Sequence, residues 1–329
     1  MMLSASRRTD IPAQYCDWFF KRLEEGFAYV RNPMSFHVVS KINLYKEAID
    51  CIVFWTKDPS KILKKIDQLN SYVKNYYFQI TINGYPKEIE KNVPPLETAI
   101  NSFIDLSKKI GKEKVIWRYD PIILSDEFDA AYHIEKFNEI AEKLNRYTKR
   151  CVISFLDIYS RTAENLSHVN YKDISESDMR DIGKKISESI KENKYNFEVY
   201  TCSEKVNLEE YGIKNGKCID DKLISEIFNI DISDKKDKSQ REECGCVKSR
   251  DIGAYNTCGN GCLYCYANFN DALRAKNIEL HDPDSPLIFG VIDESKDRIV
   301  NKAKVQKSQA ITNKEKSLNS ASKLFEIED

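Results

Sequence analysis

Short apolar runs rich in β-branched and aromatic residues alternate with longer amphipathic stretches along most of the chain. Such runs are typical of strands buried in a parallel sheet. They predict seven strands, at residues 3–6, 27–30, 51–55, 76–82, 115–119, 151–156 and 197–200. Residues 251–256 form an eighth candidate, directly before a group of cysteines.

Between several of these runs, apolar residues recur three and four positions apart, as they do on one face of a helix. The clearest case carries Phe137, Ile140, Ala141 and Leu144. Repeated strand–helix units predict an α/β fold, and seven or eight of them favour a TIM-barrel-like parallel (β/α) barrel. The alternative is an open doubly wound sheet. No Gly-x-Gly-x-x-Gly sequence follows a predicted strand, so a dinucleotide-binding fold has little support.

Polar side chains gather where the predicted strands end. In a barrel these ends meet at one mouth, where active sites form. The alternative for any single residue is that it only begins a surface loop. We take Arg118, Asp120 and Glu204 as candidate catalytic residues. Ser6 ends a predicted strand, and Arg7, Arg31 and Lys57 follow predicted strands. We expect all four near the same mouth, with Ser6, Arg7 and Arg31 as cofactor-binding residues.

Composition is that of an ordinary globular protein, with 329 residues, 41% of them hydrophobic and 31% charged. The net charge of −1 gives no general basic footprint for nucleic acid, so a nucleic-acid partner is unsupported by charge. Neither a secretory signal nor a run of about 20 apolar residues is present, which predicts a cytoplasmic protein without membrane contact. We expect residues 1–288 to form a single domain and residues 289–329 a polar tail, helical in part or disordered.

Ten cysteines in a reducing compartment indicate metal or redox chemistry where they cluster. The densest group is Cys258, Cys262 and Cys265, on a loop that also holds Gly259 and Gly261. Thiolates are soft ligands that suit iron–sulfur clusters and zinc, and the glycines allow the loop to fold closely around such a group. Three thiolates on one loop can hold three irons of a four-iron cluster and leave the fourth iron open.

The Cys-x3-Cys-x2-Cys spacing, with Tyr264 before the last cysteine, resembles the radical S-adenosylmethionine enzymes. The string Cys-Leu-Tyr-Cys-Tyr-Ala looks most like spore photoproduct lyase. The resemblance implies a 4Fe-4S cluster on Cys258, Cys262 and Cys265 whose open iron binds S-adenosylmethionine. It also implies a 5′-deoxyadenosyl radical that takes hydrogen from an unknown substrate, and a reductant such as flavodoxin or ferredoxin. Tyr264 would then lie beside the cofactor.

The cysteine loop follows seven predicted strands, whereas in ordinary members of that superfamily it follows the first. A circular permutation of the barrel would explain this order and would place residues 251–256 beside residues 3–6. The chain as a whole resembles a bacterial family known as domain of unknown function 1848. The strings that carry this likeness are Ser-Ala-Ser-Arg-Arg-Thr-Asp-Ile-Pro, Ile-Val-Phe-Trp-Thr-Lys, Trp-Arg-Tyr-Asp-Pro and Gly-Ala-Tyr-Asn-Thr-Cys.

A second set of cysteines, Cys202, Cys218, Cys244 and Cys246, is more widely spaced. Four thiolates can close an auxiliary iron–sulfur cluster or a zinc site, and the alternative is that these cysteines are isolated.

Two other functions compete with the radical enzyme. One is a zinc-bearing nucleic-acid or partner-binding protein, with Cys244 or Cys246 as the fourth ligand of the loop. The other is a metal-free hydrolase built on Asp120, Asp157, Glu204 and His133, which lacks a nucleophile motif. We expect His133 to lie at the surface.

Overall fold

The computed structural model describes residues 1–158, 160–232 and 235–301. Eight strands of these residues form one sheet in the order β10-β1-β4-β5-β6-β7-β8-β9, and every neighbouring pair is parallel. Their bounds are β1 (Met2–Ala5), β4 (Cys51–Thr56), β5 (Tyr76–Thr81), β6 (Val115–Ile122), β7 (Arg150–Phe155), β8 (Glu198–Cys202), β9 (Lys214–Gly216) and β10 (Ser249–Asp251). The protein therefore has the predicted α/β fold, built on a large parallel sheet.

The strand order follows the sequence from β1 to β9 without reversal, and β10 is added beside β1. β1 pairs with β10 from Met2 opposite Ser249 to Ser4 opposite Asp251. The strand that leads to the cysteine loop thus lies next to the first strand, as predicted. It ends at Asp251, however, and does not extend to residue 256.

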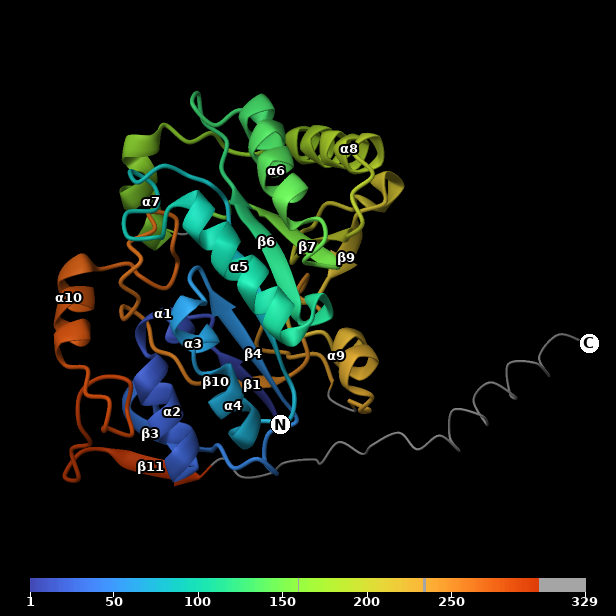
Figure 1. The fold of residues 1–329 in the computed structure, drawn as a ribbon. Helices are drawn as coiled ribbons and strands as arrows, with labels where there is room; N and C mark the ends of the chain where they lie inside the picture. Colours follow the sequence, from blue (N-terminus) through green and yellow to red (C-terminus); the bar gives the residue numbers. More distant parts are fainter. Residues whose placement is uncertain (159, 233–234, 302–329) are drawn as a thin grey trace, which may run out of the picture.

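The two faces of the sheet are buried in different cores because strand side chains alternate in direction. Ile52 and Phe54 of β4 pack with the helices of one face, in the larger core, whereas Cys51 and Val53 pack with α9 on the other. Figure 1 shows α4, α5 and α6 in front of the sheet. The helices are α1 (Ile11–Gln14), α2 (Cys16–Glu25), α3 (Ser60–Leu63), α4 (Ile66–Tyr72), α5 (Leu96–Ile110), α6 (Ala130–Leu144), α7 (Ser160–Leu166), α8 (Glu176–Glu192), α9 (Asp221–Phe228) and α10 (Asp271–Glu279). Three short 3-10 turns accompany them, η1 (Lys112–Lys114), η2 (Ser167–Val169) and η3 (Glu209–Tyr211).

A second sheet has the strand order β11-β3-β2 and consists of β2 (Phe27–Asn32), β3 (Ser35–Asn43) and β11 (Arg298–Asn301). The prediction that residues 27–30 belong to the parallel sheet was therefore wrong. Only two residues join β2 to β3, which run antiparallel. So short a link closes a hairpin but cannot make the crossover that a parallel neighbour requires.

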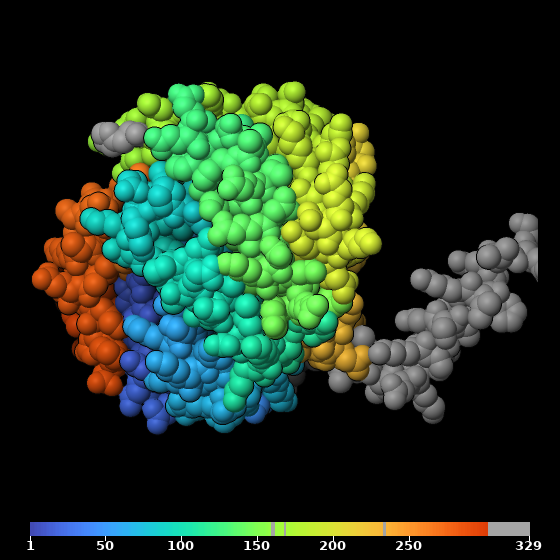
Figure 2. Space-filling model, turned by 45° about the horizontal axis from the view of Figure 1, so that its top comes forward, coloured from blue at the N-terminus to red at the C-terminus, as the bar shows by residue number. Residues whose placement is uncertain are grey.

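Part of the segment expected to be a polar tail is a strand, because β11 lies within residues 289–329 and pairs in parallel with β3. Residues 302–329 lie outside the described part of the chain. The space-filling view shows the C-terminal residues, in orange and red, against the N-terminal residues in blue (Figure 2). This contact includes the indole N–H of Trp18, which donates to the carbonyl of Ser285 at 2.9 Å. Among the described residues, no helix is both long and apolar enough to cross a bilayer.

Candidate metal centre and active site

A cavity of about 470 Å³ is lined by residues from the carboxyl ends of the parallel strands and by the cysteine loop. The strand ends contribute Ser6, Arg7, Lys57, Arg118 and Asp120. Both predicted sets of cysteines line this same cavity: Cys258, Cys262 and Cys265, and Cys202, Cys218, Cys244 and Cys246. The structure thus gathers residues from β1, β4, β6, β8 and the cysteine loop around one space.

The cysteine loop is held to α1 by a pair of amide contacts. Gln14 accepts a hydrogen bond from the backbone N–H of Gly259 at 2.6 Å and donates to the side-chain oxygen of Asn260 at 2.8 Å. The side chain of Asn260 donates in turn to Asp10 at 3.1 Å, and Asp10 caps α1 by accepting from the Ala13 N–H. The first turn of the fold after β1 therefore sets the position of the loop.

A second support for the loop comes from the segment after β5. The backbone of Glu90 forms a β-bridge with Cys262, and the side chain of Asn92 donates to the carbonyl of Gly259 at 2.7 Å. Gly261 adopts a φ of 68°, and a Cβ there would lie 3.2 Å from the Cβ of Lys91. The left-handed backbone and the close neighbour explain why the loop carries glycine at this position.

The three loop thiols have the chemistry that an iron–sulfur cluster needs. All three are free, Cys258 and Cys262 are buried, and Cys265 is half-buried. Burial raises the pKa of Cys258 to about 12 and also raises the pKa of Cys262 and Cys265, so a bound cation must displace their protons. Within the described chain, no three His, Cys, Asp or Glu side chains are grouped closely enough to hold a single metal ion. A four-iron cluster takes one thiolate on each iron, so its ligands need not converge on one point, and the loop fits that group.

Asp251 joins β10 to β1 at the edge of the cavity. Its carboxylate accepts hydrogen bonds from the hydroxyls of Ser4 and Ser6 at 2.6 and 2.7 Å, and from the backbone N–H of Arg7 at 2.9 Å. It also pairs with the Arg8 guanidinium at 3.1 Å. Burial opposes its charge, but Arg8 and the two hydroxyls hold the pKa of Asp251 below its usual range. Ser6, predicted to bind a cofactor, has its hydroxyl engaged in this network.

A buried ion pair lies under the cysteine loop. Lys57 Nζ is 2.8 Å from Glu90 Oε1, and the hydroxyl of Tyr264 donates to the same oxygen. Burial opposes the charge of Lys57, but Glu90 and Cys262 raise its pKa above the usual value. Glu90 was not predicted, because it stands in the charged string Lys-Glu-Ile-Glu-Lys, which is typical of a solvated surface.

Arg118 lies in the cavity with its guanidinium bound on several sides. It donates to Asp120 at 2.7 Å, to the side-chain oxygen of Gln79 at 2.7 Å and to the thiol of Cys218 at 3.1 Å. Asp120 also accepts from the hydroxyl of Ser154. Burial opposes the charge of Asp120, but Arg118, the Ser154 hydroxyl and Lys57 together hold the pKa of Asp120 below its usual range.

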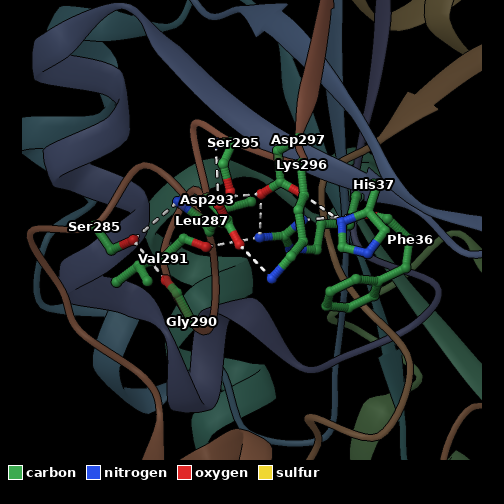
Figure 3. Close-up of polar contacts among 11 residues, drawn as sticks. Phe36, His37, Ser285, Leu287, Gly290, Val291, Asp293, Ser295, Lys296 and Asp297 are labelled. Carbon is green, nitrogen blue, oxygen red and sulfur yellow. Dashed lines mark hydrogen bonds and ion pairs between the residues drawn. The ribbon is translucent and has the colours of Figure 1, made fainter.

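Two predicted site residues lie elsewhere. Arg31 is on β2 of the second sheet, where it forms a bidentate pair with Asp297 at 2.8 and 2.9 Å. Asp297 also contacts His37 (Figure 3). The expectation that Arg31 reaches the mouth was wrong because its strand belongs to the other sheet.

Glu204 is not among the residues that line the cavity. Its carboxylate accepts a hydrogen bond from the backbone N–H of Phe155 at 2.9 Å. Burial raises the pKa of Glu204 to about 8.

The prediction that His133 lies at the surface was also wrong. Its side chain is fully buried, and its ring contacts the hydroxyl of Tyr119 and the carbonyl of Ile123. Burial lowers the pKa of His133 to about 4. His133 is therefore a buried core residue that forms hydrogen bonds within the protein.

The second set of cysteines forms a row of touching thiols. The sulfur atoms of Cys202 and Cys218 are 3.0 Å apart. Side-chain hydrogen bonds continue the row from Cys218 to Cys246 and from Cys246 to Cys244. The backbone N–H of Ile219 donates to the sulfur of Cys246 at 3.4 Å. These four cysteines are thus brought together rather than isolated.

Comparisons with known proteins identify the family. A comparison with curated proteins found no match. One solved structure that resembles the chain is provisionally assigned as an α-L-fucosidase of Bacteroides thetaiotaomicron, with 8% identity and a TM-score of 0.28 over 66% of this chain. The chain spans 60% of that structure, and a likeness this weak carries no argument. Residues 2–267 match the family described as domain of unknown function (DUF1848), and the chain therefore belongs to this family.

Proposed function

We propose that the protein is a radical S-adenosylmethionine enzyme whose 4Fe-4S cluster is held by Cys258, Cys262 and Cys265. The observation that carries the proposal is that these three cysteines line one cavity with Arg7, Arg118 and other strand-end residues. When bound, such a cluster supplies the electron that cleaves S-adenosylmethionine and so generates the 5′-deoxyadenosyl radical.

We also propose that the sheet is an incomplete barrel in circularly permuted order. Its strand order is cyclic, because β10 precedes β1 in space although it follows β9 in sequence. If the chain were opened before β10 instead of before β1, the cysteine loop would follow the first strand. This is the arrangement of ordinary members of the superfamily. A one-way strand order also supports a barrel over a doubly wound sheet, in which the order reverses.

The chain's own residues have separable tasks in this proposal. Lys57 and Glu90 neutralise each other beneath the loop, and Tyr264 is fixed by its contact with the same carboxylate. Arg118 is oriented by Asp120 and Gln79. Arg7 forms no ion pair with any described carboxylate, and its Nε is buried without a partner. Its guanidinium donates to the Ser249 hydroxyl at 3.1 Å but has no carboxylate partner, so it can pair with an anionic group in the cavity, such as a carboxylate or phosphate.

The test is anaerobic reconstitution with iron and sulfide, reduction, and measurement of 5′-deoxyadenosine after S-adenosylmethionine is added. We expect wild-type protein to form the product and Cys262→Ala to lose it. Cys151→Ala is the matched control, because Cys151 is a buried cysteine of the core between β7 and the helices. A protein that holds a reduced cluster and forms no 5′-deoxyadenosine contradicts the proposal.

Arg118 gives a second test of the same proposal. Arg118→Ala should lower 5′-deoxyadenosine formation at equal iron content. Arg118→Lys should not restore it fully, because lysine keeps the charge but loses the planar fork that binds Asp120 and Gln79 together. Unchanged turnover in Arg118→Ala would remove Arg118 from the site.

The zinc-binding alternative has less support. The four sulfurs around one zinc ion lie about 3.8 Å apart and share a centre, as tetrahedral Zn–S bonds of about 2.3 Å require. Among the described residues, no three His, Cys, Asp or Glu side chains are placed to hold one metal ion.

A further inference from the structure

We propose that Cys202, Cys218, Cys244 and Cys246 bind a second iron–sulfur cluster, on the side of the cavity formed by β8 and the segment before β10. The four cysteines come from three separate parts of the chain: the end of β8, the loop between β9 and α9, and the Cys-Gly-Cys string before β10. The fold brings them into one row, and all four line the cavity that also holds the Cys258 loop. Neither the family match nor the function proposed above assigns a role to them.

Two hydrogen-bond donors point at sulfurs of the row. The guanidinium of Arg118 is 3.1 Å from the sulfur of Cys218, and the Arg118 side chain is 6% exposed. A buried guanidinium keeps its charge at every accessible pH, so it favours a negative sulfur beside it. The Ile219 N–H also points at a sulfur, that of Cys246. Donors directed at cysteine sulfurs are a feature by which proteins set the potential of iron–sulfur clusters.

The shape of the row favours a cluster over a single metal ion. Contacts between the thiols run from Cys202 through Cys218 and Cys246 to Cys244, and no three His, Cys, Asp or Glu side chains of the described residues are placed to hold one metal ion. A four-iron cluster takes one thiolate on each iron and can span such a row. Binding must draw Cys202 and Cys218 apart from their 3.0 Å contact, which requires a side-chain rotation at one of them.

Four cysteines would ligate every iron of this second cluster. Such a cluster has no open iron for a ligand and is suited to storing or passing electrons. The inference does not depend on the radical chemistry proposed above, because the second site can be assayed without S-adenosylmethionine.

The experiment compares iron and sulfide content, together with electron paramagnetic resonance and Mössbauer spectra, in anaerobically reconstituted full-length proteins. The decisive protein is the triple variant Cys258→Ala, Cys262→Ala and Cys265→Ala, which removes the loop ligands only. We expect about eight irons in the wild type and about four in the triple variant. Cys202→Ala with Cys218→Ala should also retain about four, and Cys151→Ala should retain all eight.

Three results would overturn the inference. One is a folded triple variant that binds no iron, and another is a triple variant that binds one zinc ion in place of iron. The third is a Cys202–Cys218 double variant with the iron content of the wild type. If that double variant loses its circular dichroism spectrum, the triple variant decides alone. A second cluster in a protein that makes no 5′-deoxyadenosine would leave this inference standing and reject the proposed function.

Discussion

Asp251→Asn is the change that most directly tests how the fold positions the cysteine loop. The substitution keeps the shape of the side chain but removes its charge and turns one acceptor oxygen into a donor nitrogen. If that nitrogen replaces Oδ2, it faces the hydroxyl of Ser4 and the backbone N–H of Arg7. The hydroxyl can rotate and accept instead, but the backbone N–H cannot. Arg8 loses its carboxylate partner at the same time.

The magnitude follows from these losses. An orphaned buried N–H costs about 1–3 kcal/mol, and breaking a buried ion pair costs about 3–5 kcal/mol. Arg8 keeps its bond to the Asp251 carbonyl, and the side chains of the pair are 14% and 18% exposed, which lowers the second figure. We therefore expect the free energy of unfolding to fall by about 3–5 kcal/mol in all.

Urea denaturation of the apoprotein measures this loss, and reconstitution measures iron bound by the Cys258 loop. We expect both to fall, because Asp251 fixes the strand from which the loop departs. Asp297→Asn is the matched control, since it breaks a carboxylate–arginine pair in the second sheet and should leave iron content unchanged. A loss below about 1 kcal/mol with normal iron content in Asp251→Asn would refute the reasoning.

Three further predictions concern other parts of the site and core. Because burial lowers the pKa of His133 to about 4, the unfolded state, with a pKa of about 6.5, binds the proton first as pH falls. His133 should therefore make the free energy of unfolding about 2 kcal/mol lower at pH 5 than at pH 7, as measured by denaturation at the two pH values. His133→Gln should remove that contribution. Gly261→Ala should lower Tm more than Gly212→Ala in calorimetry, since both have positive φ but only Gly261 has a close neighbour. Lys57→Met should cost about 3–5 kcal/mol in urea denaturation by leaving its carboxylate partner buried and unpaired. Lys65→Met, at an exposed pair, should cost less than about 1 kcal/mol.

Each of these predictions has an outcome that contradicts it. If the free energy of unfolding of His133→Gln differs between pH 5 and pH 7 as much as that of the wild type, other titratable groups cause the difference. Equal losses of Tm in the two glycine variants would mean that the positive φ alone causes the loss and that the neighbour of Gly261 contributes nothing. A small effect of Lys57→Met would mean that its partner carboxylate takes up a proton or reaches water.

The strands that the sequence predicts well are those buried on both faces. Cys51–Thr56 and Tyr76–Thr81 agree with the predicted runs within one residue because almost every position in them is apolar. Lys214–Gly216 and Ser249–Asp251 have no apolar signal, because these strands at the two ends of the sheet order carry polar side chains such as Asn215 and Asp251, which form hydrogen bonds to the neighbouring strand. Periodicity cannot find strands that bury no side-chain pattern.

The sequence could predict several residues that line the cavity. The Cys258 loop was recognised from cysteines concentrated in one string, and the ends of β4 and β6 from polar residues at the ends of apolar runs. The prediction for Arg31 was wrong because the end of a strand indicates a position in the fold only when the sheet to which the strand belongs is known. His133 could have been placed correctly, because it stands four positions before Phe137 on the apolar face of α6. The position of Glu90 could not have been predicted, since its ion-pair partner, Lys57, is 33 residues away in the sequence.

The pairing of β10 with β1 also has a consequence for synthesis on the ribosome. β1 and β4 are complete once residue 56 has been made, but the strand that covers the other edge of β1 ends at residue 251. At about 5–20 residues per second, that edge is left without its partner for about 10–40 s. Open edges of this kind recruit strands from other chains. The nascent protein therefore has a long interval in which chaperones or slow local folding must keep its first strand from pairing with a neighbour's.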